Sequence, residues 1–136
     1  MSLVKIVGAI IENKKGEFLI IQEEDSGIWK PPSETIKSNE TPINAIIRGV
    51  KEETGYIIDD IQLIKIYNCK GFRGDTLRCY DYYARLIGGN PLPQKGEIKN
   101  IKLVNSNILH ELMLDCPPNH HYGKQIANFF DFISKK

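Results

Sequence analysis

The sequence predicts an α+β protein with a mixed β-sheet, because its apolar segments run in the order strands, helix, strands, helix. Runs rich in β-branched residues come first and again in the middle of the chain, and no regular strand–helix–strand alternation connects them. The 136 residues contain no repeat, linker or low-complexity tract. We therefore expect a single domain over residues 1–136.

Two strands are expected at the start of the chain. Leu3 to Ile11 and Glu17 to Gln22 are apolar and β-branched, and residues 13–16 between them, Asn-Lys-Lys-Gly, are typical of a turn. This pattern predicts a hairpin-like start. Residues 23–41 are polar and contain prolines, so we expect a long loop of functional interest there.

A helix is predicted from Thr41 to Gly55. Thr41 is a suitable N-cap, and Pro42 fits the first helical position because its missing N–H would have no partner there. Gly55 suits the left-handed conformation that closes a helix. The apolar face of this helix consists of Ile43, Ile46, Ile47 and Val50.

Three more strands are expected after this helix. Residues 57–69 and 77–87 are joined across a glycine-bearing turn, and residues 98–104 form a shorter apolar run. Because side chains alternate along a strand, Tyr82 and Tyr83 should lie on opposite faces of the sheet.

Two helices are expected near the end of the chain. Residues 106–114 form the shorter one, and residues 122–133 carry apolar side chains at helical spacing. We expect the aromatic residues of the last helix to pack in the core and not to contact a cofactor. They are Tyr122, Phe129 and Phe130.

The composition excludes several classes of protein. Hydrophobic residues make up 41% of the chain and charged residues 26%, as in a folded globular domain. The 18 Lys and Arg residues nearly balance the 17 Asp and Glu residues, which argues against a strongly basic nucleic-acid-binding module. No apolar run approaches the roughly 20 residues of a membrane span, and the first residues do not resemble a secretory signal.

The three cysteines favour a cytoplasmic location. Cys69, Cys79 and Cys116 form no CxxC pair, which is typical of free thiols in a reducing compartment, although Cys69 and Cys79 could also meet across a hairpin. A zinc site is a less favoured alternative, because its residues match no standard ligand spacing. It would use Cys116, His110, His120 and His121.

The residues of chemical interest lie between Trp29 and Tyr56. Glu52 and Glu53 lie on the last turn of the predicted helix, about 100° apart around its axis, and both can flank one cavity. Carboxylate oxygens are natural ligands of Mg²⁺ or Mn²⁺, above all where phosphate oxygens complete the coordination shell. A bound divalent ion can polarise a phosphoryl group and lower the pKa of an attacking water. An isolated Glu-Glu pair, in contrast, is usually a solvated helix end.

This pair is not isolated, because the stretch resembles the Nudix box, G-x5-E-x7-R-E-U-x-E-E-x-G-U, in which U is a bulky aliphatic or aromatic residue. The matching positions are Glu40, Arg48, Val50, Glu52, Glu53, Gly55 and Tyr56. Trp29 and Pro32 resemble the tryptophan and proline that commonly precede the box. The resemblance implies the α/β/α sandwich of the Nudix family, with a mixed β-sheet.

Two positions of the box depart from the pattern. Glu34 replaces the glycine that begins the box, and Gly49 replaces the glutamate that follows the arginine. In the family that glutamate lies one helical turn before the Glu-Glu pair and is described as a metal ligand or as the residue that orients the attacking water. Gly49 can do neither, and glycine costs a helix about 1 kcal/mol relative to alanine. A need for close backbone approach or for extra room at position 49 would explain that cost.

The resemblance implies roles for the residues that match. Glu52 and Glu53 are the candidate metal ligands, and the backbone carbonyl of Ser33 is a third. Arg48 would orient the carboxylates through an ion pair. Glu40 would support them or act as a base.

Glu34 and Glu97 are candidates to compensate for the missing glutamate. Glu34 enters the same neighbourhood from the loop and would ligate the metal, or it is a solvent-facing charge that replaces a glycine. Glu97 precedes the late strand, where some relatives place a catalytic glutamate.

The Phe72-Arg73 tip and Asp75 would contact a substrate, or they form an exposed loop tip without a partner.

Two functions are consistent with these residues. The first is a Mg²⁺- or Mn²⁺-dependent hydrolase, slowed by the missing glutamate, that cleaves a phosphoanhydride bond in a nucleoside diphosphate linked to another moiety. The alternative is a catalytically silent Nudix-fold module that binds a nucleotide, which the degenerate positions 34 and 49 would favour. Either function implies a nucleotide-type small-molecule ligand, and dimers are common in the family, which leaves a homodimer open.

Overall fold

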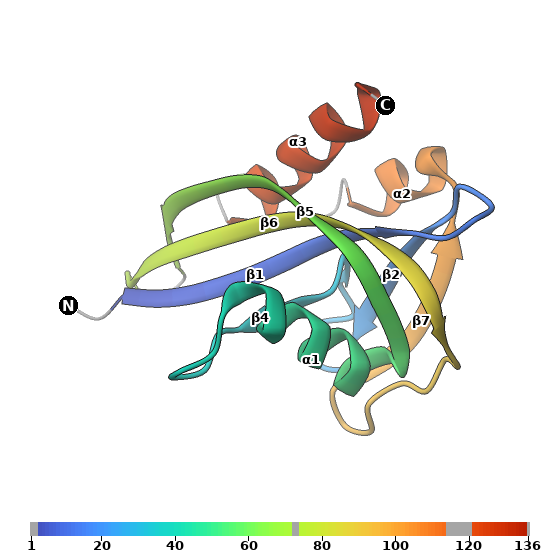
Figure 1. Ribbon diagram of the computed structural model, residues 1–136, viewed down its shortest axis with the longest axis horizontal. Coiled ribbons are helices and arrows are strands. Elements are labelled where there is room, and N and C mark those ends of the chain that lie inside the picture. The colour runs from blue at the N-terminus through green and yellow to red at the C-terminus, as the bar shows by residue number, and fades with distance from the viewer. Residues whose placement is uncertain (1–2, 72–73, 114–120, 136) are drawn as a thin grey trace.

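The computed structural model describes residues 3–71, 74–113 and 121–135. These residues form seven strands and three helices (Figure 1). In chain order the elements are β1 (Leu3–Glu12), β2 (Phe18–Glu23), β3 (Trp29–Lys30), β4 (Ser33–Thr35), α1 (Pro42–Thr54), β5 (Tyr56–Lys70), β6 (Thr76–Gly89), β7 (Ile98–Val104), α2 (Ser106–Met113) and α3 (His121–Ser134).

The strands belong to one mixed sheet, as predicted. Its main path is β3-β2-β1-β6-β5, while β4 pairs with β1 and β7 pairs with β2 outside this path. β1 and β6 are parallel, and the other pairs are antiparallel. The sheet is therefore mixed because of a single parallel pair at its centre.

The predicted hairpin forms only around its turn. Asn13 Oδ1 accepts hydrogen bonds from the N–H groups of Lys15 and Glu17, and Glu12 pairs with Phe18. Before that turn, β1 pairs with β6 instead of β2. Residues 7–11 are buried on both faces of the sheet, which is typical of a central strand and not of a hairpin at an edge.

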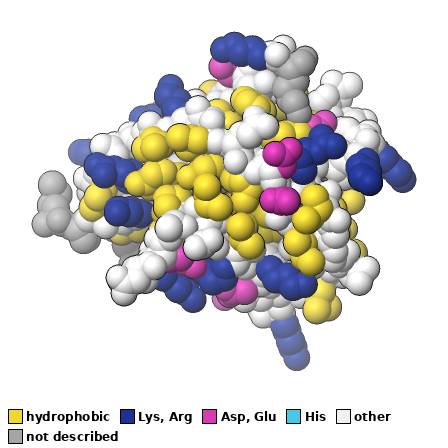
Figure 2. Space-filling view, in the orientation of Figure 1, with side chains coloured by type: hydrophobic (Ala, Val, Ile, Leu, Met, Phe, Trp, Pro, Cys, Tyr) yellow, Lys and Arg dark blue, Asp and Glu magenta, His cyan; other side chains and the backbone are white. Residues whose placement is uncertain are grey.

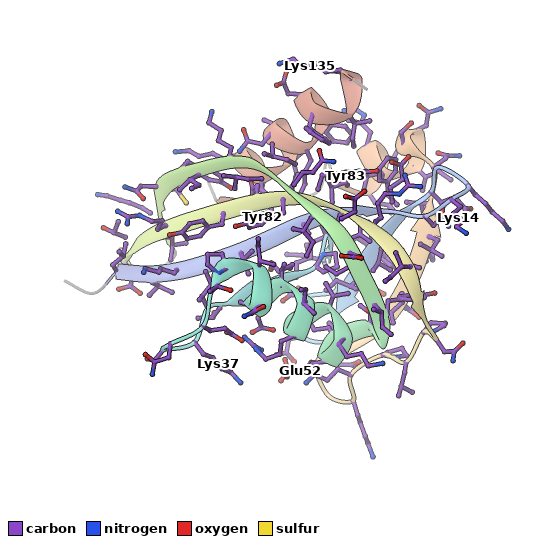
Figure 3. The ribbon with its side chains drawn as sticks, viewed as in Figure 1. Lys14, Lys37, Glu52, Tyr82, Tyr83 and Lys135 are labelled. Atoms are coloured by element: carbon purple, nitrogen blue, oxygen red, sulfur yellow. The ribbon has the colours of Figure 1, made fainter. Side chains whose placement is uncertain are left out.

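Helices cover both faces of the sheet, so the predicted α/β/α sandwich is confirmed (Figure 1). On one face Ile46 of α1 packs in a core with Tyr82, and on the other face Leu109 of α2 and Phe129 of α3 pack in a second core with Tyr83. Figure 3 labels the two adjacent tyrosines, which point to opposite sides of the sheet. The alternation of side chains along β6, expected from the sequence, thus places Tyr82 and Tyr83 in different cores.

Residues 23–41 contain two short strands that the sequence did not predict. β3 and β4 have two and three residues, too few to show a hydrophobic period. β4 pairs with the central strand, so that Ser33 lies opposite Gly8 and Glu34 opposite Val7. The segment before α1 is therefore held against the middle of the sheet.

The local signals around α1 act as predicted. Thr41 Oγ1 accepts a hydrogen bond from the N–H of Asn44 at 3.1 Å, and Pro42 begins the helix. Gly55 has a φ of 77°, and its N–H donates to the carbonyl of Lys51 at 3.0 Å. The helix therefore ends directly after its Glu-Glu pair.

Hydrophobic side chains gather on the face shown in Figure 2, across the middle of the molecule where β5 crosses in Figure 1. The exposed aliphatic residues of α1 and β5 are Ile43, Ile47, Ile57, Leu63 and Ile66. Nothing in the structure shows what covers them, so the homodimer stays a prediction. Within the described part of the chain, no helix is long and apolar enough to cross a membrane.

Candidate active site

Arg48 holds three carboxylates together beside α1. Its Nε donates to Glu40 Oε2 at 2.7 Å and its Nη2 to Glu40 Oε1 at 2.9 Å. Nη1 donates to Glu52 Oε1 at 2.9 Å and lies 3.7 Å from Glu34 Oε2. Nη2 also donates to the carbonyl oxygen of Thr35 at 3.2 Å, which ties β4 to the helix. The structure thus brings together four of the residues predicted for the site.

The pairing with Arg48 changes the ionisation of Glu40. Hydrogen bonds from the Arg48 guanidinium and from the backbone N–H of Lys37 lower the pKa of Glu40 to about 2. In return, the hydrogen bond to Glu40 raises the pKa of Arg48. A carboxylate with so low a pKa is a poor proton acceptor, which favours the supporting role for Glu40 over the role of a base.

Glu53 lies in a more buried environment than its neighbour Glu52. Its Oε1 is buried and has no hydrogen-bond partner. Burial raises the pKa of Glu53 to about 8; Lys30 opposes this shift, while the charges of Glu34, Glu23 and Glu97 add to it. A buried carboxylate oxygen without a partner is costly, so this atom is suited to a ligand that supplies positive charge.

Lys30 and Glu23 belong to this neighbourhood although the sequence did not single them out. Lys30 is 6% exposed, and its Nζ lies 3.2 Å from Glu23 Oε2 and 3.4 Å from Ser33 Oγ. The pairing of β2 with β3, which sets Ile21 opposite Lys30, brings these residues together. A single lysine in a polar segment gives no periodic signal, so only its burial reveals it.

Glu34 lies directly over Gly49. A Cβ at position 49 would be 2.8 Å from Glu34 Cβ and 3.0 Å from both Cγ and Oε2 of that side chain. The side chain of Glu34 is 24% exposed and packs on the helix, so it is not simply a solvent-facing charge. The extra room that the glycine suggested is therefore present, and Glu34 fills it.

Two other candidates lie around this group. Glu97 is exposed in the loop before β7, where its carbonyl accepts a hydrogen bond from the N–H of Glu24 at 2.9 Å. Its charge acts on Glu53, whereas the carboxylates that pair with Arg48 are those of Glu34, Glu40 and Glu52. Ser33 lies in β4 next to Lys30, and the role of its carbonyl stays a prediction.

The remaining predictions concern the cysteines, the histidines and the loop tip. Cys69 and Cys79 are free thiols that meet across the β5–β6 hairpin, with their sulfur atoms 3.7 Å apart. Cys116, His120 and the Phe72-Arg73 tip lie outside the described residues. Across residues 3–71, 74–113 and 121–135, no three His, Cys, Asp or Glu side chains form a ready-made metal cage, so the zinc alternative has no support there.

Comparison with known proteins identifies the family of this chain. The family model described as the NUDIX domain matches residues 3–122. The chain belongs to the Nudix hydrolase family. The resemblance drawn from the box in residues 34–56 is therefore confirmed over most of the chain.

Individual Nudix proteins are similar to parts of the chain. The RNA pyrophosphohydrolase of Marinomonas is 36% identical over 58 residues, which are 43% of this chain and 36% of that protein. The 8-oxo-dGDP phosphatase NUDT18 of Mus musculus is 32% identical over 87 residues, which are 62% of this chain and 26% of that protein. The NUDIX hydrolase from Nitrosomonas europaea has the same fold, with a TM-score of 0.81 and 19% identity over 99% of this chain and 91% of that one.

The chain spans less than half the length of several curated relatives that it matches. The matched part makes up 24%, 21% and 49% of the relatives from Caenorhabditis elegans, Arabidopsis thaliana and Streptomyces ambofaciens. What those whole proteins do therefore reaches this chain only as a proposal.

The donor set fits the divalent ion that Nudix hydrolases generally use. The buried, unpartnered Glu53 Oε1 supplies an oxygen without competition from a hydrogen-bond donor, and Glu52 lies next to it in the chain. Mg²⁺ is commonly held by one or two carboxylates together with substrate phosphates, and not by a complete protein cage. Glu52 and Glu53 supply two such carboxylates at the end of α1.

Proposed function

We propose that this Nudix protein hydrolyses a phosphoanhydride bond in a nucleoside diphosphate linked to another moiety, with the help of Mg²⁺ or Mn²⁺. The buried and unpartnered Glu53 Oε1 carries the proposal. This carboxylate also faces the negative charges of Glu34, Glu23 and Glu97, and Lys30 is the cation that opposes them. Such a concentration of negative charge is costly in the free protein and becomes favourable when a divalent cation binds.

Each carboxylate has its own part in this proposal. Glu53 and Glu52 would hold the ion, with the carbonyl of Ser33 as a further oxygen. When bound, the ion would polarise the phosphoryl group and lower the pKa of the attacking water. Arg48 keeps Glu52 in place through the 2.9 Å hydrogen bond, and Glu40 keeps Arg48 in place through two more.

The position of Lys30 supports the proposal that the substrate is an anion. Its ammonium is nearly buried between Glu23 and Ser33, and its charge acts on Glu53. A buried ammonium beside a carboxylate site suits a phosphate group that binds at the same place as the metal ion. The names of the two curated relatives, an RNA pyrophosphohydrolase and an 8-oxo-dGDP phosphatase, support a nucleotide-type substrate.

The second candidate is a catalytically silent module that binds a nucleotide. One observation favours it: Gly49 leaves α1 without the third glutamate of the box.

The cytoplasmic location also stays a prediction, which rests on the cysteine pattern.

The test is metal-dependent hydrolysis of a panel of nucleoside triphosphates, nucleoside diphosphate sugars and dinucleoside polyphosphates. We expect turnover with Mg²⁺ or Mn²⁺, about a hundredfold lower in Glu53→Gln. Glu111→Gln, an exposed glutamate on α2, is the matched control and should keep wild-type activity. Nucleotide binding without turnover of any substrate would favour the silent module instead.

A further inference from the structure

Compared with the box pattern, glycine and glutamate are exchanged between positions 34 and 49. The pattern has glycine at the first of these positions and glutamate at the second, whereas this chain has Glu34 and Gly49. We propose that this is an exchange: Glu34 supplies from β4 the carboxylate that α1 lacks at position 49, and it helps to hold the divalent ion. This inference rests on the proposed function.

The geometry shows that the two side chains compete for one space. A Cβ on residue 49 would overlap the Cβ and Cγ of Glu34, at 2.8 and 3.0 Å. The Oε2 of Glu34 would also lie 3.0 Å from that Cβ. A glutamate at 49 and a glutamate at 34 therefore exclude each other, and a glycine at one position makes room for a carboxylate from the other.

The backbone of β4 holds Glu34 in this position. Glu34 pairs with Val7 of the central strand, and Thr35 next to it accepts a hydrogen bond from Arg48. The carboxylate thus approaches the helix from a strand fixed in the sheet, not from a loose loop. A fixed backbone allows Glu34 to replace a helical residue as a ligand.

The contacts of Glu34 leave one oxygen of its carboxylate available. Its Oε1 accepts a hydrogen bond from the backbone N–H of Thr35 at 3.2 Å. Its Oε2 is 3.7 Å from Arg48 Nη1, beyond hydrogen-bond distance, whereas Glu40 and Glu52 accept hydrogen bonds from Arg48 at 2.7 to 2.9 Å. The charge of Glu34 also acts on Glu53. Of the three carboxylates around Arg48, Glu34 has the longest contact with the guanidinium and is the one whose charge acts on Glu53. A cation between Glu34 and Glu53 would relieve their repulsion.

The test compares Mn²⁺ binding by the wild type, Glu34→Gln and the double variant Glu34→Gly/Gly49→Glu. Free Mn²⁺ is measured by electron paramagnetic resonance, and the thermal stability of the metal-free proteins is measured alongside. Glu34→Gln should bind Mn²⁺ at least about tenfold more weakly, with a metal-free Tm within about 3 °C of the wild type. The double variant restores the box pattern and should regain most of the affinity.

The outcomes separate this inference from the proposed function. If the wild type binds Mn²⁺ and Glu34→Gln binds it equally well, Glu34 is only an ion-pair partner of Arg48, and the exchange is wrong while the hydrolase proposal stands. If the wild type neither binds Mn²⁺ nor hydrolyses any nucleotide, both are wrong. Glu111→Gln controls for the general loss of a negative charge.

Discussion

Gly8 on β1 lies directly beneath the side-chain amide of Gln125 on α3. A Cβ on residue 8 would overlap the Nε2 of Gln125, which is itself 2% exposed and donates a hydrogen bond to Asp81 Oδ1 at 3.2 Å. The last helix thus packs on the central strand through a contact that requires glycine.

Gly8→Ala should destabilise the protein by about 1 to 3 kcal/mol, because the new methyl group would push the Gln125 amide away from Asp81. Unfolding in urea measures this loss. Gly88→Ala is the matched control, since a Cβ there has open space around it and should change the free energy of unfolding by less than about 0.5 kcal/mol. Equal effects of the two substitutions would rule out the predicted clash.

Asp81 should make the folded state less stable as the pH rises from about 4 to about 6. Burial raises the pKa of Asp81 to about 6, although hydrogen bonds from Asn128 and Gln125 lower it in part. The folded state therefore binds more protons than the unfolded state in this range. The free energy of unfolding should fall by up to about 3 kcal/mol through this group.

Unfolding in urea at several pH values checks this prediction. Asp81→Asn keeps one carbonyl oxygen, which can accept one of the two amide hydrogen bonds, but its side chain does not titrate. The free energy of unfolding of this variant should therefore not fall between pH 4 and pH 6. Curves of wild type and Asp81→Asn that stay parallel from pH 4 to 7 would contradict the raised pKa.

The fit between Glu34 and Gly49 can be tested on stability alone. Gly49→Ala should destabilise the wild type by about 1 kcal/mol or more, because the new Cβ meets the Glu34 side chain at 2.8 Å. In a Glu34→Gly background the same substitution should stabilise the protein by about 1 kcal/mol, since alanine favours a helix more than glycine does. A Gly49→Ala effect of the same sign and size in both backgrounds would mean that Glu34 does not fill this space.

Arg48→Lys should lower kcat by at least about tenfold with a smaller effect on KM. An ammonium cannot form the two parallel hydrogen bonds to Glu40 while it also binds Glu52. The pKa of Glu40, followed by NMR, should rise toward its usual value in this variant. Arg78→Lys on β6 is the matched control and should leave both quantities unchanged; an unaltered Glu40 pKa in Arg48→Lys would refute the positioning role.

Much of the fold follows from local signals in the sequence. Thr41, Pro42 and Gly55 set the limits of α1 because capping depends on residues within one turn of the helix end. The alternation that puts Tyr82 and Tyr83 in different cores is equally local. The box residues Glu40, Arg48, Glu52 and Glu53 could be found for the same reason, since most of them lie on one helix.

Other features were decided only by contacts between distant segments. The sequence alone determined the three helices, the five longer strands, the charged residues of the box and the unusual pair at positions 34 and 49. The tertiary structure decided that β1 pairs with β6, that Lys30 is buried beside Glu23, and that Glu34 covers Gly49. Strand pairing and the competition of two side chains for one space depend on which segments the sheet brings together, and no local pattern encodes that choice.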